Sequence, residues 1–124
     1  MNDIMKRECL AKFGGRCAYC GSLRGRTVDH VRPLDRGGVD WPDNLMPACN
    51  PCNNAKANMT LEEFRIALYN VRFNIMPHKK TALSEAGRRW IQLARRFSDP
   101  TVIFWFEKVR TSKAPMYLTA KGSP

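Results

Sequence analysis

The chain has 124 residues, a length that suits one domain, and its 44% hydrophobic and 26% charged residues exclude an intrinsically disordered chain. Its longest apolar run, Val102–Phe106, is far too short to cross a bilayer, so the sequence shows no membrane segment. Twenty-one Lys and Arg against eleven Asp and Glu give a net charge of +10, which favours a nucleic-acid partner; a ribosomal-type protein or simple solubility charge would also account for it.

An N-terminal helix is expected from Asp3, a good N-cap residue, to about Phe13. Met5, Cys9 and Phe13 recur every four residues and would share one apolar face. Cys9 is therefore interpreted as a buried core thiol and not as a metal ligand. The Gly-Gly pair that follows is expected to end the helix.

The next segment, residues 16–57, is rich in Gly, Pro, Asn and Cys and poor in large apolar residues. A strand is expected over Thr27–Val31 and a second extended piece over Leu45–Ala48, joined by a long loop that contains a Gly-Gly pair. A helix is expected to follow, with Asn50 as its N-cap and Pro51 in its first turn.

Two helices and a strand are expected in the second half. Residues 60–63 form a capping box that starts the first helix, and the β-branched and aromatic residues of Thr101–Phe106 predict a strand. Between them, a long helix is expected from Leu83 to Phe97. Its apolar face would hold Leu83, Ala86, Trp90, Leu93 and Phe97, and its opposite face a continuous basic strip of Arg88, Arg89, Arg95 and Arg96.

Four of the five cysteines form two C-x-x-C pairs, Cys17 with Cys20 and Cys49 with Cys52, separated by 28 residues. Each pair can turn two sulfurs toward one tetrahedral ion, so together they predict a structural Zn²⁺ held by four thiolates. The N-terminus lacks the apolar stretch of a secretory signal, which points to the cytoplasm, where disulfides are rare. A redox-active pair or an iron–sulfur cluster is the alternative, but no βαβ pattern of a thioredoxin-like unit is visible.

The residues between and beside these pairs add a carboxylate, an imidazole and two amides: Asp29 and His30 on the first strand, Asn44 before the second, and Asn53 after the last cysteine. Phosphodiester hydrolysis needs a deprotonated water and a cation that stabilises charge on the leaving oxygen. His30 suits the general base because an imidazole changes protonation near neutral pH. We expect its other ring nitrogen to bond a backbone carbonyl of the loop. A structural histidine and helix-capping asparagines would be the alternative.

With the four cysteines and the Gly-Gly loop in the same order, residues 14–58 resemble the HNH endonuclease family. The resemblance implies an α+β fold: a ββα-metal (His-Me finger) core with two zinc knuckles, flanked by an N-terminal helix and by C-terminal helices plus a strand. It also implies His30 as the general base, Asp29 and Asn53 as ligands of a catalytic cation, and Asn44 as the residue that orders the loop.

The third motif position departs from the family pattern, since many members carry His where this chain has Asn53. A neutral amide oxygen beside the carboxylate of Asp29 would form a hard oxygen site, which favours Mg²⁺ or Mn²⁺ over softer ions. Phosphate oxygens would then have to complete the coordination shell.

Most of the positive charge lies outside the motif. Residues 1–58 carry nine basic and six acidic side chains, whereas residues 59–124 carry twelve and five. Residues 59–113 are therefore expected to be a helical and strand extension that helps to bind DNA. The basic residues predicted to contact DNA are Arg32, Arg36, Lys56, Arg88, Arg89, Arg95 and Arg96.

The sequence thus predicts one HNH nuclease domain over residues 1–124, a metal-dependent DNA endonuclease acting on duplex or single-stranded DNA. A non-catalytic, zinc-stabilised nucleic-acid-binding module is the main alternative, and an RNA substrate is a weaker third. The oligomeric state, sequence specificity and biological role stay open at this point.

Overall fold

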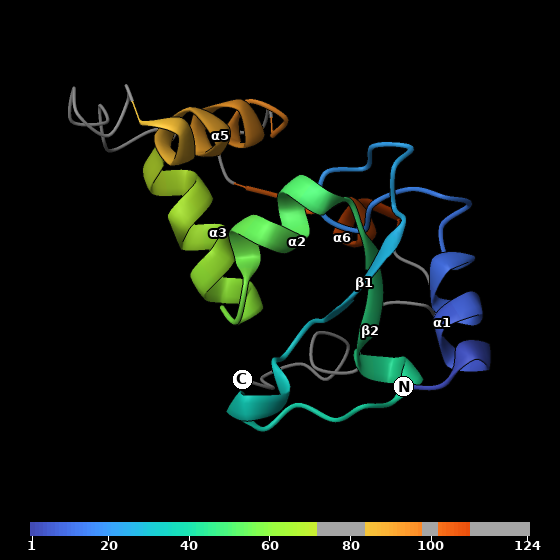
Figure 1. The fold of residues 1–124 in the computed structure, drawn as a ribbon. Coiled ribbons are helices and arrows are strands. Elements are labelled where there is room, and N and C mark those ends of the chain that lie inside the picture. Colours follow the sequence, from blue (N-terminus) through green and yellow to red (C-terminus); the bar gives the residue numbers. More distant parts are fainter. Residues whose placement is uncertain (72–83, 98–101, 110–124) are drawn as a thin grey trace.

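A computed structural model describes residues 1–71, 84–97 and 102–109 of the chain (Figure 1). The described part combines helices with a two-stranded antiparallel sheet, as the α+β prediction requires. None of its helices is long and apolar enough to span a membrane. The elements are α1 (Asp3–Leu10), β1 (Thr27–His30), β2 (Leu45–Ala48), α2 (Asn50–Lys56), α3 (Leu61–Tyr69), α5 (Glu85–Ala94) and α6 (Trp105–Val109), with 3₁₀ turns at Leu34–Arg36 and Pro42–Asn44.

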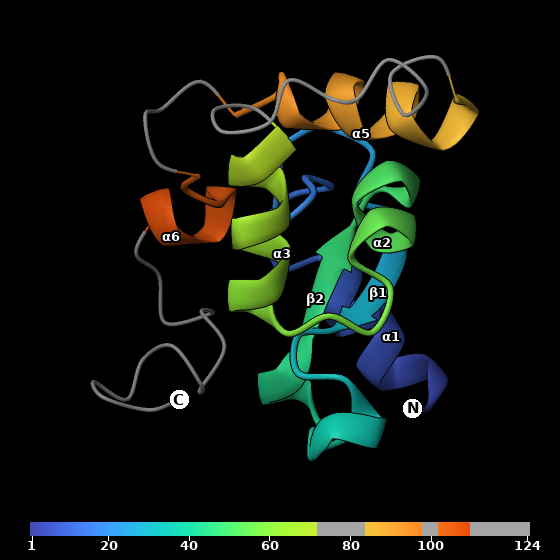
Figure 2. The same ribbon diagram turned by 90° about the vertical axis from the view of Figure 1, so that its left-hand side faces the viewer.

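The sheet pairs β1 with β2 so that Thr27 lies opposite Ala48 and His30 opposite Leu45. The predicted bounds of β2 are confirmed, and β1 ends one residue before the predicted Val31. Val31 still bonds to the residue that precedes β2, because its N–H donates to the carbonyl of Asn44 at 2.9 Å. Helix α2 follows β2 directly and lies against the sheet (Figure 2), which gives the order strand, strand, helix.

Two helix starts differ from the predictions by one residue. Asn2, and not Asp3, caps α1, because its side-chain oxygen accepts the N–H of Met5 at 2.8 Å. Helix α1 also ends at Leu10, before the predicted Phe13, in a series of turns. Its one fully buried residue is Cys9, as predicted for a core thiol.

Helix α2 is capped by Cys49 and not by the predicted Asn50. The sulfur of Cys49 accepts the N–H of Cys52, with an N···S distance of 3.5 Å. The reason is that Cys49 already turns its sulfur inward, toward the other cysteines, where it meets the first turn of the helix. Asn50 is exposed instead.

Helix α3 begins as predicted, with the reciprocal capping box of Thr60 and Glu63. Leu61, Phe64 and Leu68 form its buried face. A capping box is a local arrangement of four residues, so the prediction needed no tertiary information.

Helix α5 is shorter than the predicted Leu83–Phe97. Ser84 is its N-cap, and Leu83 lies outside the described residues. The buried stripe is also rotated from the prediction: Ala86 is exposed, and Gly87 and Ala94 are buried. Helix α5 contacts both α2 and α3, so two neighbours determine which residues are covered.

The strand predicted over Thr101–Phe106 is wrong: residues 102–104 have no regular structure and α6 begins at Trp105, while Thr101 lies outside the described residues. Alternate side chains are buried, as in a strand, but no strand of the described residues pairs with this segment. Instead, the N–H groups of Trp105 and Phe106 donate to carbonyls of the first cysteine turn, and the Glu107 carboxylate accepts the N–H of Phe104 at 2.8 Å. These bonds start a helix.

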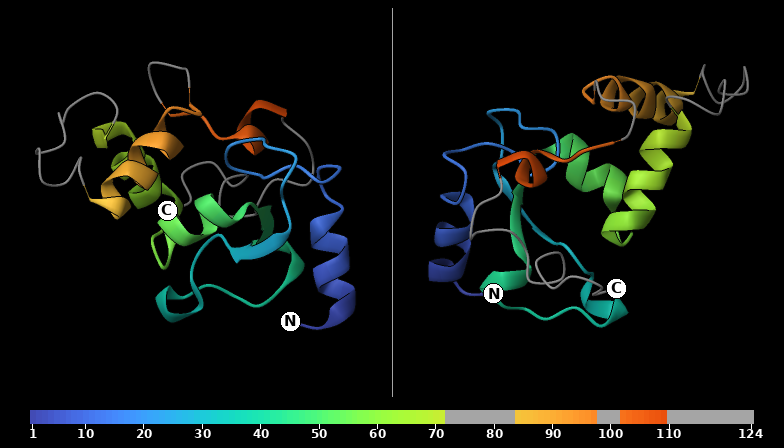
Figure 3. Two further views of the ribbon diagram at one scale, coloured as in Figure 1. Left: turned by 45° about the horizontal axis from the view of Figure 1, so that its top comes forward. Right: turned by 180° about the vertical axis from the view of Figure 1, so that it is seen from behind.

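An aromatic core joins α3, α5 and the segment before α6, which lie together on one side of the sheet (Figure 3). Phe104 is its centre, stacked on Phe64 and Phe106 and edge-on to Phe97 and Tyr19. Tyr19 belongs to the first C-x-x-C pair, so this core packs directly against the cysteine turn.

Candidate active site and metal centre

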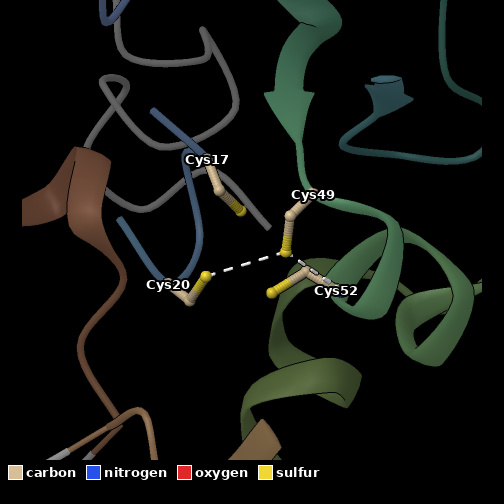
Figure 4. Close-up of side chains that lie close together, drawn as sticks. All are labelled: Cys17, Cys20, Cys49 and Cys52. Carbon is tan, nitrogen blue, oxygen red and sulfur yellow. Dashed lines mark hydrogen bonds between the residues drawn. The ribbon is translucent and has the colours of Figure 1, made fainter. Parts of the chain in front are cut away.

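The four paired cysteines converge from two parts of the chain, the turn before β1 and the junction of β2 with α2 (Figure 4). All four sulfurs lie within 4.8 Å of one another, and those of Cys20 and Cys49 are 3.7 Å apart. Zn–S bonds of about 2.3 Å in a tetrahedron would set the sulfurs about 3.8 Å apart. The cluster thus has the donors and the spacing for one tetrahedral metal ion.

The pKa values of the four thiols are shifted in opposite directions. Hydrogen bonds from neighbouring cysteines lower the pKa of Cys20, and lower that of Cys49 to about 6, whereas they raise the pKa of Cys17 and Cys52. The guanidinium Nη1 of Arg96 lies 3.4 Å from the Cys20 sulfur and 3.6 Å from the Cys49 sulfur. The cation of Arg96 therefore lies beside two of the four sulfurs.

A second site lies where β1 meets α2. Asp29, His30 and Asn53 line one cavity of about 390 Å³, together with Asp35 and Asn58. The two strand residues come from the end of β1, and Asn53 comes from the first turns of α2, one residue after the last cysteine. Asn53 therefore adjoins the cysteine cluster directly, whereas Asp29 and His30 follow its first pair at a distance along the chain.

Asp29 is almost fully buried, with 6% of its surface exposed. Burial raises the pKa of its carboxyl group, and the ammonium of Lys56 and the hydroxyl of Tyr19 oppose that effect. Lys56 Nζ lies 3.0 Å from Asp29 Oδ2, and the Tyr19 hydroxyl donates to the same oxygen. The residue therefore has a charged partner and a hydroxyl donor on one oxygen while it lines the cavity.

Lys56 corrects the prediction of a phosphate contact. Its side chain is fully buried, and its ammonium donates to the carbonyl of His30 at 3.1 Å besides pairing with Asp29. A buried ammonium is stable only with such partners. Lys56 therefore connects the end of α2 to the end of β1 inside the protein, and its charge does not reach the surface.

His30 bonds a carboxylate and not the expected backbone carbonyl. Its Nε2 lies 2.8 Å from Asp40 Oδ1, and the other oxygen of Asp40 accepts the N-terminal amine. Sequence reasoning missed Asp40, because an acidic residue in a Gly-rich loop looks like ordinary surface charge. Its spacing of ten residues from His30 gives no local signal.

Asn44 closes the loop between the strands. Its fully buried side chain accepts the N–H of Arg32 and donates to the carbonyls of Arg32 and Val39, each at 2.9 Å. A Cβ on Gly38 would come within 1.9 Å of the Arg32 carbonyl oxygen, so the loop leaves no room for a side chain there. These contacts fix the backbone of the loop that follows His30.

Asn53 has its amide oriented by a short chain of hydrogen bonds. Its Nδ2 donates to the Thr27 hydroxyl at 3.0 Å, and that hydroxyl donates to the Ala48 carbonyl at 2.6 Å. Thr27 was another residue that the sequence did not single out, since a threonine in a strand is unremarkable. With the amide nitrogen used in this way, the Asn53 oxygen is the atom left to act as a ligand.

The predicted basic residues divide into several environments. Arg36 is exposed and forms a two-bond pair with Glu63, and Arg32 Nη1 donates to the Arg36 carbonyl at 3.4 Å. The four arginines of and after α5 are all exposed, as a basic surface requires; Arg89 and Arg96 line a cleft against α2, whereas Arg88 and Arg95 do not line it.

Comparison with known proteins identifies the same segment. Residues 17–59 match the family model described as HNH endonuclease. The chain is also similar to the "SPbeta prophage-derived putative HNH endonuclease YoqL" of Bacillus subtilis (strain 168), with 27% identity over 75 residues. That match covers 52% of this chain and 33% of the relative, so the chain spans about a third of the relative's length. No solved structure matches the chain.

Proposed function

We propose that this chain is a DNA endonuclease that hydrolyses phosphodiester bonds with the help of a divalent cation. The observation that carries the proposal is that Asp29, His30 and Asn53 line one cavity at the junction of β1 and α2. The HNH endonuclease match over residues 17–59 includes all three and supports the same reaction.

Zn²⁺ is the proposed ion of the cysteine cluster. Four sulfurs within 4.8 Å leave no position for water or substrate on a tetrahedral ion, which is typical of a structural site. The ion's role in the proposal is to hold the end of β2 and the start of α2 against the turn before β1, and thus to hold Asn53 near Asp29.

Asp29 and Asn53 are the proposed ligands of the catalytic cation. One carboxylate and one amide oxygen form a hard oxygen site that suits Mg²⁺ or Mn²⁺. When bound, such a cation would polarise the phosphate and stabilise the negative charge that develops on the leaving oxygen. Lys56 and Tyr19 both bind Oδ2 of Asp29, so Oδ1 is the oxygen that we assign to the cation.

His30 is the proposed general base that removes a proton from the attacking water. Asp40 acts through it as a positioning residue, since its carboxylate bonds the imidazole Nε2 and fixes the ring, which leaves Nδ1 to meet the water. Asn44 supports this arrangement indirectly, because it bonds the carbonyl of Val39, next to Asp40 in the loop. Arg32 and Arg36, on the same loop, are proposed to contact DNA phosphates.

A plasmid-nicking assay tests the proposal. Wild-type protein loaded with Zn²⁺ should nick supercoiled DNA when Mg²⁺ or Mn²⁺ is added and should be inert without it. His30→Ala should lower the rate about 100-fold or more, the usual contribution of a general base. Asn53→Ala should raise the concentration of Mg²⁺ or Mn²⁺ needed, and Asp40→Asn should lower the rate about tenfold with little change in melting temperature.

His78→Ala is the matched control, because it removes the other histidine of the sequence. It should leave the rate unchanged. A wild-type protein that binds DNA but stays inert with every divalent ion would contradict the enzyme and favour a non-catalytic, zinc-stabilised DNA-binding module. RNA cleaved in preference to DNA would correct the substrate.

A further inference from the structure

A larger cavity lies on the other side of α2, between α2 and α5. Its volume of about 590 Å³ is within the range of small-molecule sites, roughly 300–1,000 Å³. It is separate from the cavity of the proposed active site, with which it shares no lining residue. The side chains that give it chemical character are Asn50, Asn54, Arg89, Trp90, Gln92 and Arg96.

These side chains suit one kind of ligand. Trp90 presents a half-buried indole to the cavity, with its ring edge-on to Phe64 at 6.2 Å. Arg89 and Arg96 bring two guanidinium groups, and three amide side chains bring donors and acceptors. No acidic residue lines the cavity among the described parts of the chain. An aromatic surface for stacking, amides for base edges and cations for phosphate together match a nucleotide.

The position of the cavity relates it to the proposed active site. Asn50 and Asn54 are one helical turn apart and face this cavity, while Asn53 faces the other one. A helix with its side chains is about 10–12 Å across, so the two cavities lie on adjacent faces of one narrow element. A nucleic-acid strand that crosses α2 could thus reach both.

We propose that the cleft between α2 and α5 binds an unpaired nucleotide of the DNA strand, with its base stacked on Trp90 and a flanking phosphate on Arg89. The identity of the strand as DNA rests on the proposed function. Arg96 supports the wall of the cleft, because its guanidinium is also held by the Cys20 and Cys49 sulfurs. An unpaired nucleotide is required because a base inside a duplex has no free face to stack on a side chain.

Two neighbouring arginines provide a matched test. Arg88 and Arg89 are both exposed on α5; Arg89, which also pairs with Glu85 on the same helix, lines the cleft, and Arg88 does not. Binding of a labelled single-stranded oligonucleotide is measured by fluorescence anisotropy in the zinc-loaded His30→Ala protein without added Mg²⁺, so that no cleavage occurs. Arg89→Glu should weaken binding at least about tenfold more than Arg88→Glu. Equal losses would overturn the proposal and leave only a general basic surface.

The indole is tested separately. Quenching of tryptophan fluorescence by the oligonucleotide should be lost in Trp90→Phe but kept in Trp41→Phe, whose side chain is exposed elsewhere. Trp90→Leu should weaken binding at least about fivefold, and Trp90→Phe should restore much of it, because stacking needs an aromatic ring. An oligonucleotide of abasic sites that binds as tightly as the normal strand would overturn base stacking. If polyglutamate displaced the labelled oligonucleotide as strongly as unlabelled oligonucleotide does, the cleft would not be a nucleotide site, and an acidic protein would be the better ligand.

The two proposals can fail independently. Binding with these properties in a protein that never cleaves DNA would keep the cleft and reject the nuclease. Cleavage that needs His30 but is unchanged by Arg89→Glu and Trp90→Leu would keep the nuclease and reject the cleft.

Discussion

Two regions of this molecule are held together by different forces. Residues 17–59 contain the cysteine cluster, the sheet and α2, and their interior combines the four cysteine sulfurs and buried polar groups such as Asn44 and Lys56 with a few large apolar side chains, among them Tyr19, Leu45 and Met46. The second region, formed by α3, α5 and residues 102–109, is an aromatic core centred on Phe104. The first region positions the side chains of the proposed active site, and the second supplies most of the large buried apolar side chains.

Tyr19 belongs to both regions. Its ring packs edge-on against Phe64, Phe104 and Phe106, and its hydroxyl donates to the Asp29 carboxylate. Its pKa is raised well above the usual value, first because it is buried and then because Asp29 lies close. We therefore expect substitutions in the aromatic core to change the position of Asp29 in the proposed active site through Tyr19.

Metal removal should have the largest effect. A structural Zn²⁺ is worth about 10–16 kcal/mol in small modules, more than residues 17–59 could gain from their few large apolar side chains. Chelation should unfold this region, and Cys52→Ala should prevent metal binding. Circular dichroism and zinc stoichiometry measure both effects.

Cys9→Ala is the control for metal removal, since Cys9 is equally buried but lies outside the cluster. It should keep one ion per chain and lose only a small part of the stability. A circular dichroism spectrum that stays the same after verified loss of the metal would reject the role proposed for the cluster.

Phe104→Ala should come next, with a loss of about 3–5 kcal/mol in the free energy of unfolding, because it leaves a cavity among four aromatic rings. Trp41→Ala, at a residue with 61% of its surface exposed, should change it by less than about 0.5 kcal/mol. Urea denaturation of the zinc-loaded proteins measures both. Losses of similar size would show that the aromatic side chains do not form a core of this kind.

Tyr19→Phe should have a smaller effect on stability than Phe104→Ala, about 1 kcal/mol, because the ring stays and only the hydroxyl is lost. Its effect on function should be larger than on stability, since Asp29 loses a donor that orients its carboxylate. Melting temperature and nicking rate, measured on the same preparations, separate the two effects. A rate equal to that of the wild type would show that Asp29 needs no support from the aromatic region.

Sequence reasoning succeeded where the signal was local. The Thr60 capping box, the bounds of β2 and the pairing of the cysteines into one cluster each depend on residues whose spacing alone limits the geometry. It failed at residues 101–106, where burial alternates as in a strand but the backbone bonds the cysteine turn and then enters α6. It also failed for Lys56, whose charge suggested a surface contact.

The amino-acid sequence by itself determined the cysteine cluster and the order strand, strand, helix, because these follow from residue type and spacing, and its resemblance to the HNH endonuclease family indicated the residues that carry the proposed chemistry. Only the tertiary structure decided which groups surround them: Asp40 on His30, Tyr19 and Lys56 on Asp29, and the cleft of Trp90 and Arg89 against α2. These partners come from distant or separately packed elements, and a contact of that kind depends on how the elements pack and leaves no periodic signal in the chain.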